Sequence, residues 1–416
     1  MRVTRTLALL VCGGAFATPT LAVGQDAVRR VTLAEALESF GRNSLSLRIA
    51  RSESAGIAGR ARQDRAYANP TLRMSRETLG RGVEDYWETT AGLAQRIEWP
   101  GRTAARGRLA VHTVDAAAAR FRADSIRLAF EVREAYAQAW LAEEVEGAAA
   151  QAADVIRTVA EAAERRLEVG DISPYETRRL RIERVRVDQD LADTRLRVRA
   201  ARRTLAALID PEAETLEAAP SEGLAGVPPP IDRRVAVEAL AGRPDLEAAA
   251  REVDAAAAAL SMASAAWAPQ PTLNLGYKEQ ADGFSGATFG VDLPLPLFDR
   301  GRAGRDGAAA RESAAAQRRD LHRRQAEIDV MAASDSYESA RSRLEEVGDE
   351  LLADAEALLL AARAAYAEGE MTLVEALDAA DAFRDARIAA VSLRSRAWIA
   401  YYDLLRAMGR APGSEG

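Results

Sequence analysis

The sequence predicts a mainly α-helical fold with a small β part, built from two similar halves. Three observations predict it. Long tracts rich in Ala, Arg, Glu and Leu contain little glycine or proline, which is typical of long helices or coiled coils. Only four runs of residues favour strands. A short glycine-containing motif occurs twice, at residues 167–176 and 366–375.

The repeated motif predicts a hairpin of two helices in each half. Gly170 and Gly369 stand where a left-handed residue ends a helix. A hydroxyl residue follows, with a glutamate three positions later, which is the spacing of a capping box. These pairs are Ser173 with Glu176 and Thr372 with Glu375. Pro174 stands at the first helical position, where its missing N–H is harmless.

Other matching segments also lie about 200 residues apart. Residues 70–72 read Pro-Thr-Leu, as do residues 271–273, and Gly-Arg occurs at 101–102 and 301–302. This spacing is far longer than that of a solenoid repeat and indicates a duplicated domain. The predicted division is a first repeat over 25–209, a linker over 210–233, a second repeat over 234–409 and a disordered tail over 410–416.

The first half begins with a helix over residues 32–67, because apolar residues recur at helical spacing up to a proline. Residues 71–77 and 87–99 then alternate with a period of two and predict a pair of strands. Residues 102–168 lack proline and predict a helix on the order of 100 Å long. The hairpin motif follows, and a helix over residues 174–209 completes the half.

The second half repeats this order. A helix over residues 232–267 is expected to break at Pro244. Strands are expected over residues 271–279 and 286–298, although two prolines in the last run place its end away from the middle of a sheet. A helix over residues 302–367 and another after the second hairpin motif complete the half.

Residues 1–24 have the pattern of a secretory signal peptide, in which basic residues precede an apolar run. Cleavage after Ala22 or Gly24 would release an exported mature chain. No later stretch reaches the roughly 18 apolar residues of a transmembrane helix. Cys12, the only cysteine, lies in this leader, so the mature chain would hold no disulfide and no thiolate site.

The composition argues against nucleic acid as a partner, because the net charge is −7 at pH 7 and the pI is about 5.3. The chain also carries no catalytic constellation. His112 and His322 are the only histidines, and both lie in predicted long helices. Without a Cys/His cluster, a Gly-rich phosphate loop or a Ser-His-Asp set, neither an enzyme nor a cofactor or metal site is expected.

The four strands leave two interpretations open. Strands of about ten residues can span a bilayer, but only in a closed barrel whose edges are all paired. Four strands cannot enclose a lumen, so several chains would have to contribute to one barrel. The alternating apolar face, with Trp87 and Trp99 at its ends, suits a lipid-facing band. A small antiparallel sheet packed on the helices fits the same pattern.

Two further motifs, together with the hairpins, resemble a known family. Residues 31–36 read Val-Thr-Leu-Ala-Glu-Ala, and residues 243–248 read Arg-Pro-Asp-Leu-Glu-Ala. In order, spacing and duplication these motifs are similar to those of the TolC-type outer-membrane efflux proteins, over essentially the whole mature chain. The resemblance implies a homotrimer with four strands per chain in a twelve-stranded outer-membrane β-barrel, which continues into a periplasmic α-barrel of long helical hairpins.

The resemblance also implies a function. Family members are passive exit ducts of tripartite efflux systems, with a periplasmic adaptor and an inner-membrane transporter, here expected to be of the RND class. The cysteine-free mature chain and short extracellular loops look more like the CzcC-like heavy-metal cation branch. The chain is then expected in the outer membrane, in contact with lipid, with a large periplasmic part. The alternative from another class is a soluble periplasmic coiled-coil scaffold or adaptor without a barrel.

In the family, acidic side chains constrict the periplasmic end of the duct. By the resemblance these positions fall on Glu375 and Asp378, which are three residues apart and share a helix face. Three chains would place six carboxylates around one opening, where like-charge repulsion would raise some carboxylate pKa values. The alternative is that Glu375 only caps a helix and Asp378 only faces solvent.

Two further sets of tip residues follow from the resemblance. Tip closure is expected to involve Tyr366 with Tyr175 and Glu176. Met371 occupies the position of the family's basic lock residue, which puts the ionic part of the lock in doubt. The residues expected to meet the adaptor are Val169, Gly170, Asp171, Glu368, Gly369 and Glu370. Simple helix-ending turns would show the same residues, and exposed turns are where partners dock.

Overall fold

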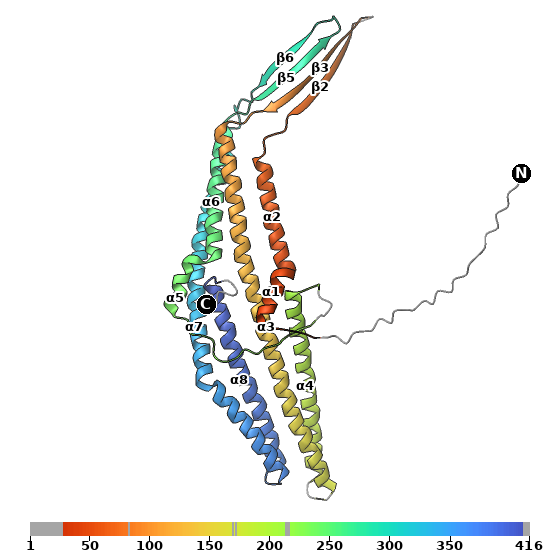
Figure 1. Ribbon diagram of the computed structural model, residues 1–416, viewed down its shortest axis with the longest axis vertical. Coiled ribbons are helices and arrows are strands. Elements are labelled where there is room, and N and C mark those ends of the chain that lie inside the picture. The colour runs from red at the N-terminus through yellow and green to blue at the C-terminus, as the bar shows by residue number, and fades with distance from the viewer. Residues whose placement is uncertain (1–27, 82–83, 169, 171–172, 213–216, 411–416) are drawn as a thin grey trace, which may run out of the picture.

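The computed structural model of the chain is an elongated bundle of long helices with a sheet at one end (Figure 1). It describes residues 28–81, 84–168, 170, 173–212 and 217–410. The predicted leader over residues 1–24 and the tail beyond residue 410 lie outside the described residues. The sheet and the two hairpin tips stand at opposite ends of the molecule, as Figure 1 shows.

The prediction of a mainly helical fold with a small β part is confirmed. The helices are α1 (Leu33–Asn43), α2 (Leu45–Arg65), α3 (Pro100–Glu168), α4 (Pro174–Ile209), α5 (Arg233–Glu238), α6 (Pro244–Ser264), α7 (Arg302–Ala367) and α8 (Leu373–Ala407), with 3-10 turns η1 (Ala239–Gly242) and η2 (Ala265–Trp267). The strands are β1 (Arg29–Val31), β2 (Thr71–Arg81), β3 (Glu84–Arg96), β4 (Ala218–Pro220), β5 (Thr272–Gln280) and β6 (Ser285–Asp292). None of the described helices combines the length and apolar composition of a membrane span.

The predicted single helix over residues 32–67 is wrong, because the chain breaks at Ser44, whose ψ of 124° is not helical. The side chains before the break contact the end of α4 instead. The Ser39 hydroxyl donates to the Ile209 carbonyl at 3.3 Å, and the Asn43 amide donates to Asp210 at 3.0 Å. The break therefore follows from tertiary contacts that helical periodicity does not reveal.

The second half breaks at the matching place, just before Pro244, as predicted. Arg243 is 6% exposed and donates to the Ala407 carbonyl at 2.8 Å, which ties the break to the end of α8. It also donates to both carboxylate oxygens of Asp245, at 2.9 and 2.6 Å. Burial alone would raise the pKa of Asp245, but the guanidinium outweighs burial and holds the pKa below its usual value. Each half thus fixes its helix break to the end of its own hairpin.

Several strand predictions are also wrong: β2 runs on to Arg81, and β3 spans Glu84–Arg96 and so ends before Trp99. The linker over residues 210–233 contains β4, which pairs in parallel with β1, so the four predicted strands are not the only β structure. Segments of three residues are too short for a period of two to show. The last strand, expected over residues 286–298, ends at Asp292. Pro294 and Pro296 lack the N–H groups that would continue the ladder.

The main sheet is antiparallel, with the order β2-β3-β5-β6, so the pairing of β3 with β5 joins the two halves. Leu72, Leu93, Leu275 and Phe289 lie opposite one another across the four strands, and therefore on the same face. Among the described residues, β2 and β6 are edge strands without a second partner. The described sheet is thus open, with a neighbour on only one side of each edge.

The helices bury three apolar clusters along the bundle. One surrounds the middle of α3, where Val132 and Tyr136 pack with residues of α1 and α4. A second joins α5, α7 and α8 around Tyr337 and Tyr401. The third, which we call the tip cluster, lies between α3, α4, α7 and α8 and contains the fully buried Phe383. The two hairpins therefore form one packed unit at the tip end and do not project as separate arms.

Candidate functional site

Both hairpin turns adopt the predicted capping geometry. Gly170 and Gly369 have φ values of 81° and 79°, which glycine adopts without strain. In the second hairpin the Thr372 N–H donates to the Glu375 carboxylate at 2.8 Å, and the Glu375 N–H donates to the Thr372 hydroxyl at 3.4 Å. The same reciprocal pair forms in the first hairpin between Ser173 and Glu176, at 2.9 and 3.3 Å. The predicted capping boxes are confirmed.

The two predicted aperture residues lie on the exposed side of the first turns of α8. Hydrogen bonds from the Thr372 backbone and hydroxyl lower the pKa of Glu375, so its carboxylate is ionised at neutral pH. Asp378 follows three residues later and is also exposed. Among the residues that the structure describes, no three His, Cys, Asp or Glu side chains gather as metal ligands. One chain therefore presents a pair of neighbouring carboxylates without a preformed metal site.

The residues predicted to close the tip lie in two different surroundings. Tyr366 is 6% exposed within the tip cluster, and Met371 packs against the same cluster. Tyr175 is 71% exposed at the start of α4, outside the cluster. Glu176 is held in its capping box. In a single chain Tyr366 and Met371 thus share the tip cluster, whereas Tyr175 lies exposed outside it.

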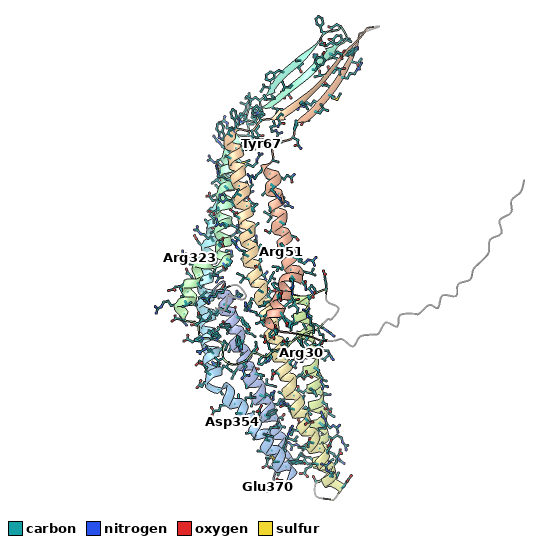
Figure 2. All side chains as sticks on the ribbon, viewed as in Figure 1. Arg30, Arg51, Tyr67, Arg323, Asp354 and Glu370 are labelled. Atoms are coloured by element: carbon teal, nitrogen blue, oxygen red, sulfur yellow. The ribbon has the colours of Figure 1, made fainter. Side chains whose placement is uncertain are left out.

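The residues predicted to meet the adaptor stand at the far end of the hairpins. Glu368, Gly369 and Glu370 are exposed in the second turn, and Figure 2 shows Glu370 at the extreme tip. Gly170 is exposed in the first turn. Val169 and Asp171 lie outside the described residues. The described tip positions are thus accessible to a partner that approaches along the bundle axis.

At the opposite end, the sheet has one apolar and one polar face. The apolar face carries large side chains that are at least half exposed, namely Leu72, Met74, Leu93, Leu275, Tyr277, Phe289 and Val291. On the polar face Lys278 forms an ion pair with Glu88, and Asn274 donates to Asp292 at 2.9 Å. No described helix covers the apolar face, since the sheet extends beyond the bundle (Figure 1).

The comparison with protein families shows to which family the chain belongs. The family described as "Outer membrane efflux protein" matches residues 33–210 and again residues 235–410. The chain belongs to the outer membrane efflux protein family. The family model thus matches the chain in two successive segments. The family favours an outer-membrane duct over a soluble scaffold.

Individual relatives agree with this assignment. The cobalt-zinc-cadmium resistance protein CzcC of Cupriavidus metallidurans is 26% identical over 415 residues, which cover 95% of this chain and 97% of CzcC. A membrane protein from Pseudomonas aeruginosa has a TM-score of 0.77 at 21% identity, with 91% of this chain and 92% of that one covered. The Campylobacter jejuni CmeC outer membrane channel has a TM-score of 0.77 at 16% identity, with coverage of 92% and 87%.

These findings fix the general role of the protein. It is an efflux duct of the outer membrane, with a part in the periplasm. Its family is one of transport channels and not of enzymes. As a member of this family it works in a tripartite efflux system with partner proteins. Two exposed surfaces remain to be assigned to parts of the duct. They are the apolar face of the sheet and the hairpin turns.

Proposed function

We propose that three copies of this chain form one duct, in which each contributes four strands to a twelve-stranded β-barrel in the outer membrane. The observation that carries this proposal is the open sheet with an exposed apolar face and two unpaired edges. In hydrocarbon an unpaired edge leaves backbone groups without partners, so β6 of one chain has to pair with β2 of the next. The apolar face then meets lipid, and the polar face lines the lumen.

The helices support lateral assembly with a second copy of the chain. Exposed apolar residues remain on the outer sides of α4 and α7 after each has packed within its own chain. Counted from the hairpin ends, Ile182 of α4 and Leu360 of α7 both lie about 11 Å up the bundle, and both are exposed. Apolar contacts at matched heights would let α4 of one copy pack on α7 of its neighbour.

The charges on these two helices are complementary as well. Five exposed arginines of α4 have no ion pair with any described residue, namely Arg178, Arg179, Arg181, Arg197 and Arg199. Four carboxylates on the lower half of α7 are likewise unpaired among the described residues, namely Glu346, Glu350, Asp354 and Glu356. Figure 2 shows Asp354 on this part of α7. The best match in height is between Arg197 of α4 and Glu346 of α7, about 35 and 32 Å up the bundle, and opposite charges there favour a parallel, side-by-side arrangement of copies.

At the tip, we propose that Glu375 and Asp378 of three copies form the periplasmic aperture. Six carboxylates around one opening would hold cations and exclude anions. Closure would use Tyr366 together with Tyr175 and Glu176, and it would lack an ionic lock at Met371. The proposed contacts with the adaptor are the turn residues Val169, Gly170, Asp171, Glu368, Gly369 and Glu370.

The proposed cargo is heavy-metal cations, because CzcC, a cobalt-zinc-cadmium resistance protein, matches almost the whole chain. A passive duct needs an energy source, which we assign to an inner-membrane transporter of the RND class joined by a periplasmic adaptor. The proposed division is a removed leader over residues 1–24, repeats over 25–209 and 234–409, a linker over 210–233 and a tail over 410–416.

Native mass spectrometry of the protein released from detergent tests the assembly. The proposal predicts a single species with the mass of three mature chains. A monomer that remains soluble without detergent would contradict the barrel and favour the scaffold. A stable oligomer of another size would contradict the twelve-stranded barrel while it leaves the duct in place.

A further inference from the structure

The polar face of the main sheet carries acidic and basic side chains in equal number. Residues that lie opposite in the register share a face, and so do alternate residues along each strand. Among the side chains that the structure describes, the charged residues on this face are Arg73, Arg96, Lys278, Glu77, Glu88 and Asp292. The described charges of the polar face therefore cancel within one chain.

Two glycines leave the middle of the polar face without side chains. Gly92 of β3 lies opposite Gly276 of β5, and a Cβ atom on Gly92 would come within 2.7 Å of the Leu275 carbonyl oxygen. A side chain at this place would displace backbone, which is why glycine is required there. Arg73 of β2 reaches past the two glycines to Asp292 of β6, at 4.0 Å. These two charges thus cancel at the end of the sheet that is nearer to the bundle.

On the outer side of the glycines the polar face is organised around Lys278. Its ammonium group forms an ion pair with one carboxylate oxygen of Glu88, and the Gln280 amide donates to the other oxygen at 3.1 Å. The side chains of Lys278 and Glu88 are 33% and 28% exposed, so the pair remains in contact with water. Glu77 of β2 lies directly opposite Glu88, and like charges in such a position destabilise a sheet. Lys278 therefore offsets one charge of an otherwise acidic pair.

Assembly would repeat this arrangement around the lumen. In the proposed trimer each copy contributes one Lys278–Glu88 pair at the same level of the barrel. With Lys278 in place, the described charges of the three polar faces cancel. Without it, three negative charges would be left uncompensated. Fixed charge of one sign on the wall of a narrow, water-filled pore concentrates ions of the other sign. One side chain per copy thus decides whether the barrel favours cations.

We propose that Lys278 keeps the lumen of the β-barrel electrically neutral, so that selection for cations is confined to the aperture. The sheet and the hairpin tips lie at opposite ends of the molecule (Figure 1), so the two levels act separately. Conduction requires that an ion be held weakly enough to leave. Cations that pass the aperture then leave through a barrel that does not hold them again. This inference rests on the proposed function, in which the polar face lines the lumen.

Reversal potentials of the full mature protein in a planar bilayer, under a KCl gradient, test this role. Glu375→Gln with Asp378→Asn serves as the background, because the aperture carboxylates would otherwise dominate the selectivity. In this background Lys278→Gln should raise the ratio of cation to anion permeability by about twofold or more, whereas Lys278→Arg should leave it unchanged. The matched control is Arg76→Gln, which removes a positive charge from the apolar face, where Arg76 lies 4.9 Å from the centre of the Trp87 ring. It should not change the ratio.

A second measurement needs no substitution at position 278. Lys278 is the only lysine among the 56 lysines and arginines of the chain. The water-soluble reagent sulfo-N-hydroxysuccinimide acetate converts its ammonium group into a neutral amide. In the aperture background, acetylation should raise the permeability ratio as Lys278→Gln does. The Lys278→Arg protein, which keeps its α-amino group, should not respond. Mass spectrometry of the peptide that contains Lys278 measures the extent of acetylation.

The outcomes separate this inference from the proposed function. Channels whose permeability ratio is the same with and without the charge of Lys278 would overturn the inference and leave the duct in place. An equal rise in Arg76→Gln would overturn it as well, because the effect would not depend on the polar face. A Lys278 amine that fails to react in water would contradict its place in a water-filled lumen. The absence of any channel from the native protein would overturn the duct and this inference together.

Discussion

Arg243 binds both the Asp245 carboxylate and the Ala407 carbonyl, an arrangement that we call the Arg243 clamp. This clamp gives the most direct prediction about the stability of the second half. Removal of one partner from a buried ion pair costs about 3–5 kcal/mol, because the other charge is left without compensation. The Asp245 side chain is 43% exposed, so water compensates part of its charge when Arg243 is removed. The Ala407 carbonyl loses its donor as well. For Arg243→Ala we therefore expect a loss of about 2–4 kcal/mol in the free energy that holds the end of α8 closed.

Hydrogen exchange of the amides in the last turn of α8 measures this free energy locally. A loss of 2–4 kcal/mol corresponds to exchange about 30- to 900-fold faster. The matched control is Arg251→Ala on the same helix, since Arg251 makes only longer pairs, at 3.9 Å with Glu247 and 3.8 Å with Asp254. Such exposed pairs contribute about 0.5 kcal/mol. Equal effects of the two substitutions, or a change below about threefold for Arg243→Ala, would refute the clamp.

The same pair predicts a pH dependence with a definite sign. The pKa of Asp245 in the folded chain lies below its usual value of 3.8. A lowered carboxylate pKa gives stability that is present above the usual value and is lost as pH falls through the folded pKa. Exchange at the end of α8 should therefore accelerate in the native protein only below about pH 4. In Arg243→Ala this acid-induced step should be absent.

The other predictions concern the tip and the proposed seam between copies, where α4 of one copy packs on α7 of its neighbour. In planar bilayers, Glu375→Gln with Asp378→Asn should reduce cation selectivity, and an unchanged reversal potential would remove these residues from the aperture. The hydrogen bonds from Thr372 lower the pKa of Glu375, which counteracts the like-charge repulsion expected within a ring of six carboxylates. Arg197→Glu should lower the thermal stability of the oligomer, and Glu346→Arg should restore it; no restoration would contradict the seam. Thr372→Ala should destabilise the start of α8 by about 0.5–2 kcal/mol, as measured by faster exchange there, whereas unaltered exchange would mean that the cap is not needed.

Local sequence signals predicted the hairpins well. The capping pair of Thr372 and Glu375 and the positive φ of Gly369 depend on residues within one turn, so spacing alone reveals them. The break at Ser44 and the pairing of β1 with β4 were missed for the opposite reason. Both depend on contacts between segments more than 160 residues apart, such as that between Ser39 and Ile209.

The candidate site was predictable only in part. The exposure of Glu375 and Asp378 follows from the helical register of α8, but their assignment to an aperture came from the family resemblance. The burial of Tyr366 in the tip cluster depends on four helices that meet there, and no single stretch of sequence encodes it. The strand predicted over residues 286–298 concealed the apolar segment after Asp292, because alternating leucines give the same period of two with or without a ladder.

Single-channel recording from the purified mature protein in a planar bilayer tests the central claim most directly. The account predicts long-lived openings that favour cations, from a species with the mass of three chains. Multivalent cations should block these openings, because they bind between the aperture carboxylates. The absence of any channel, with the protein recovered in water without detergent, would contradict an outer-membrane duct built from this chain.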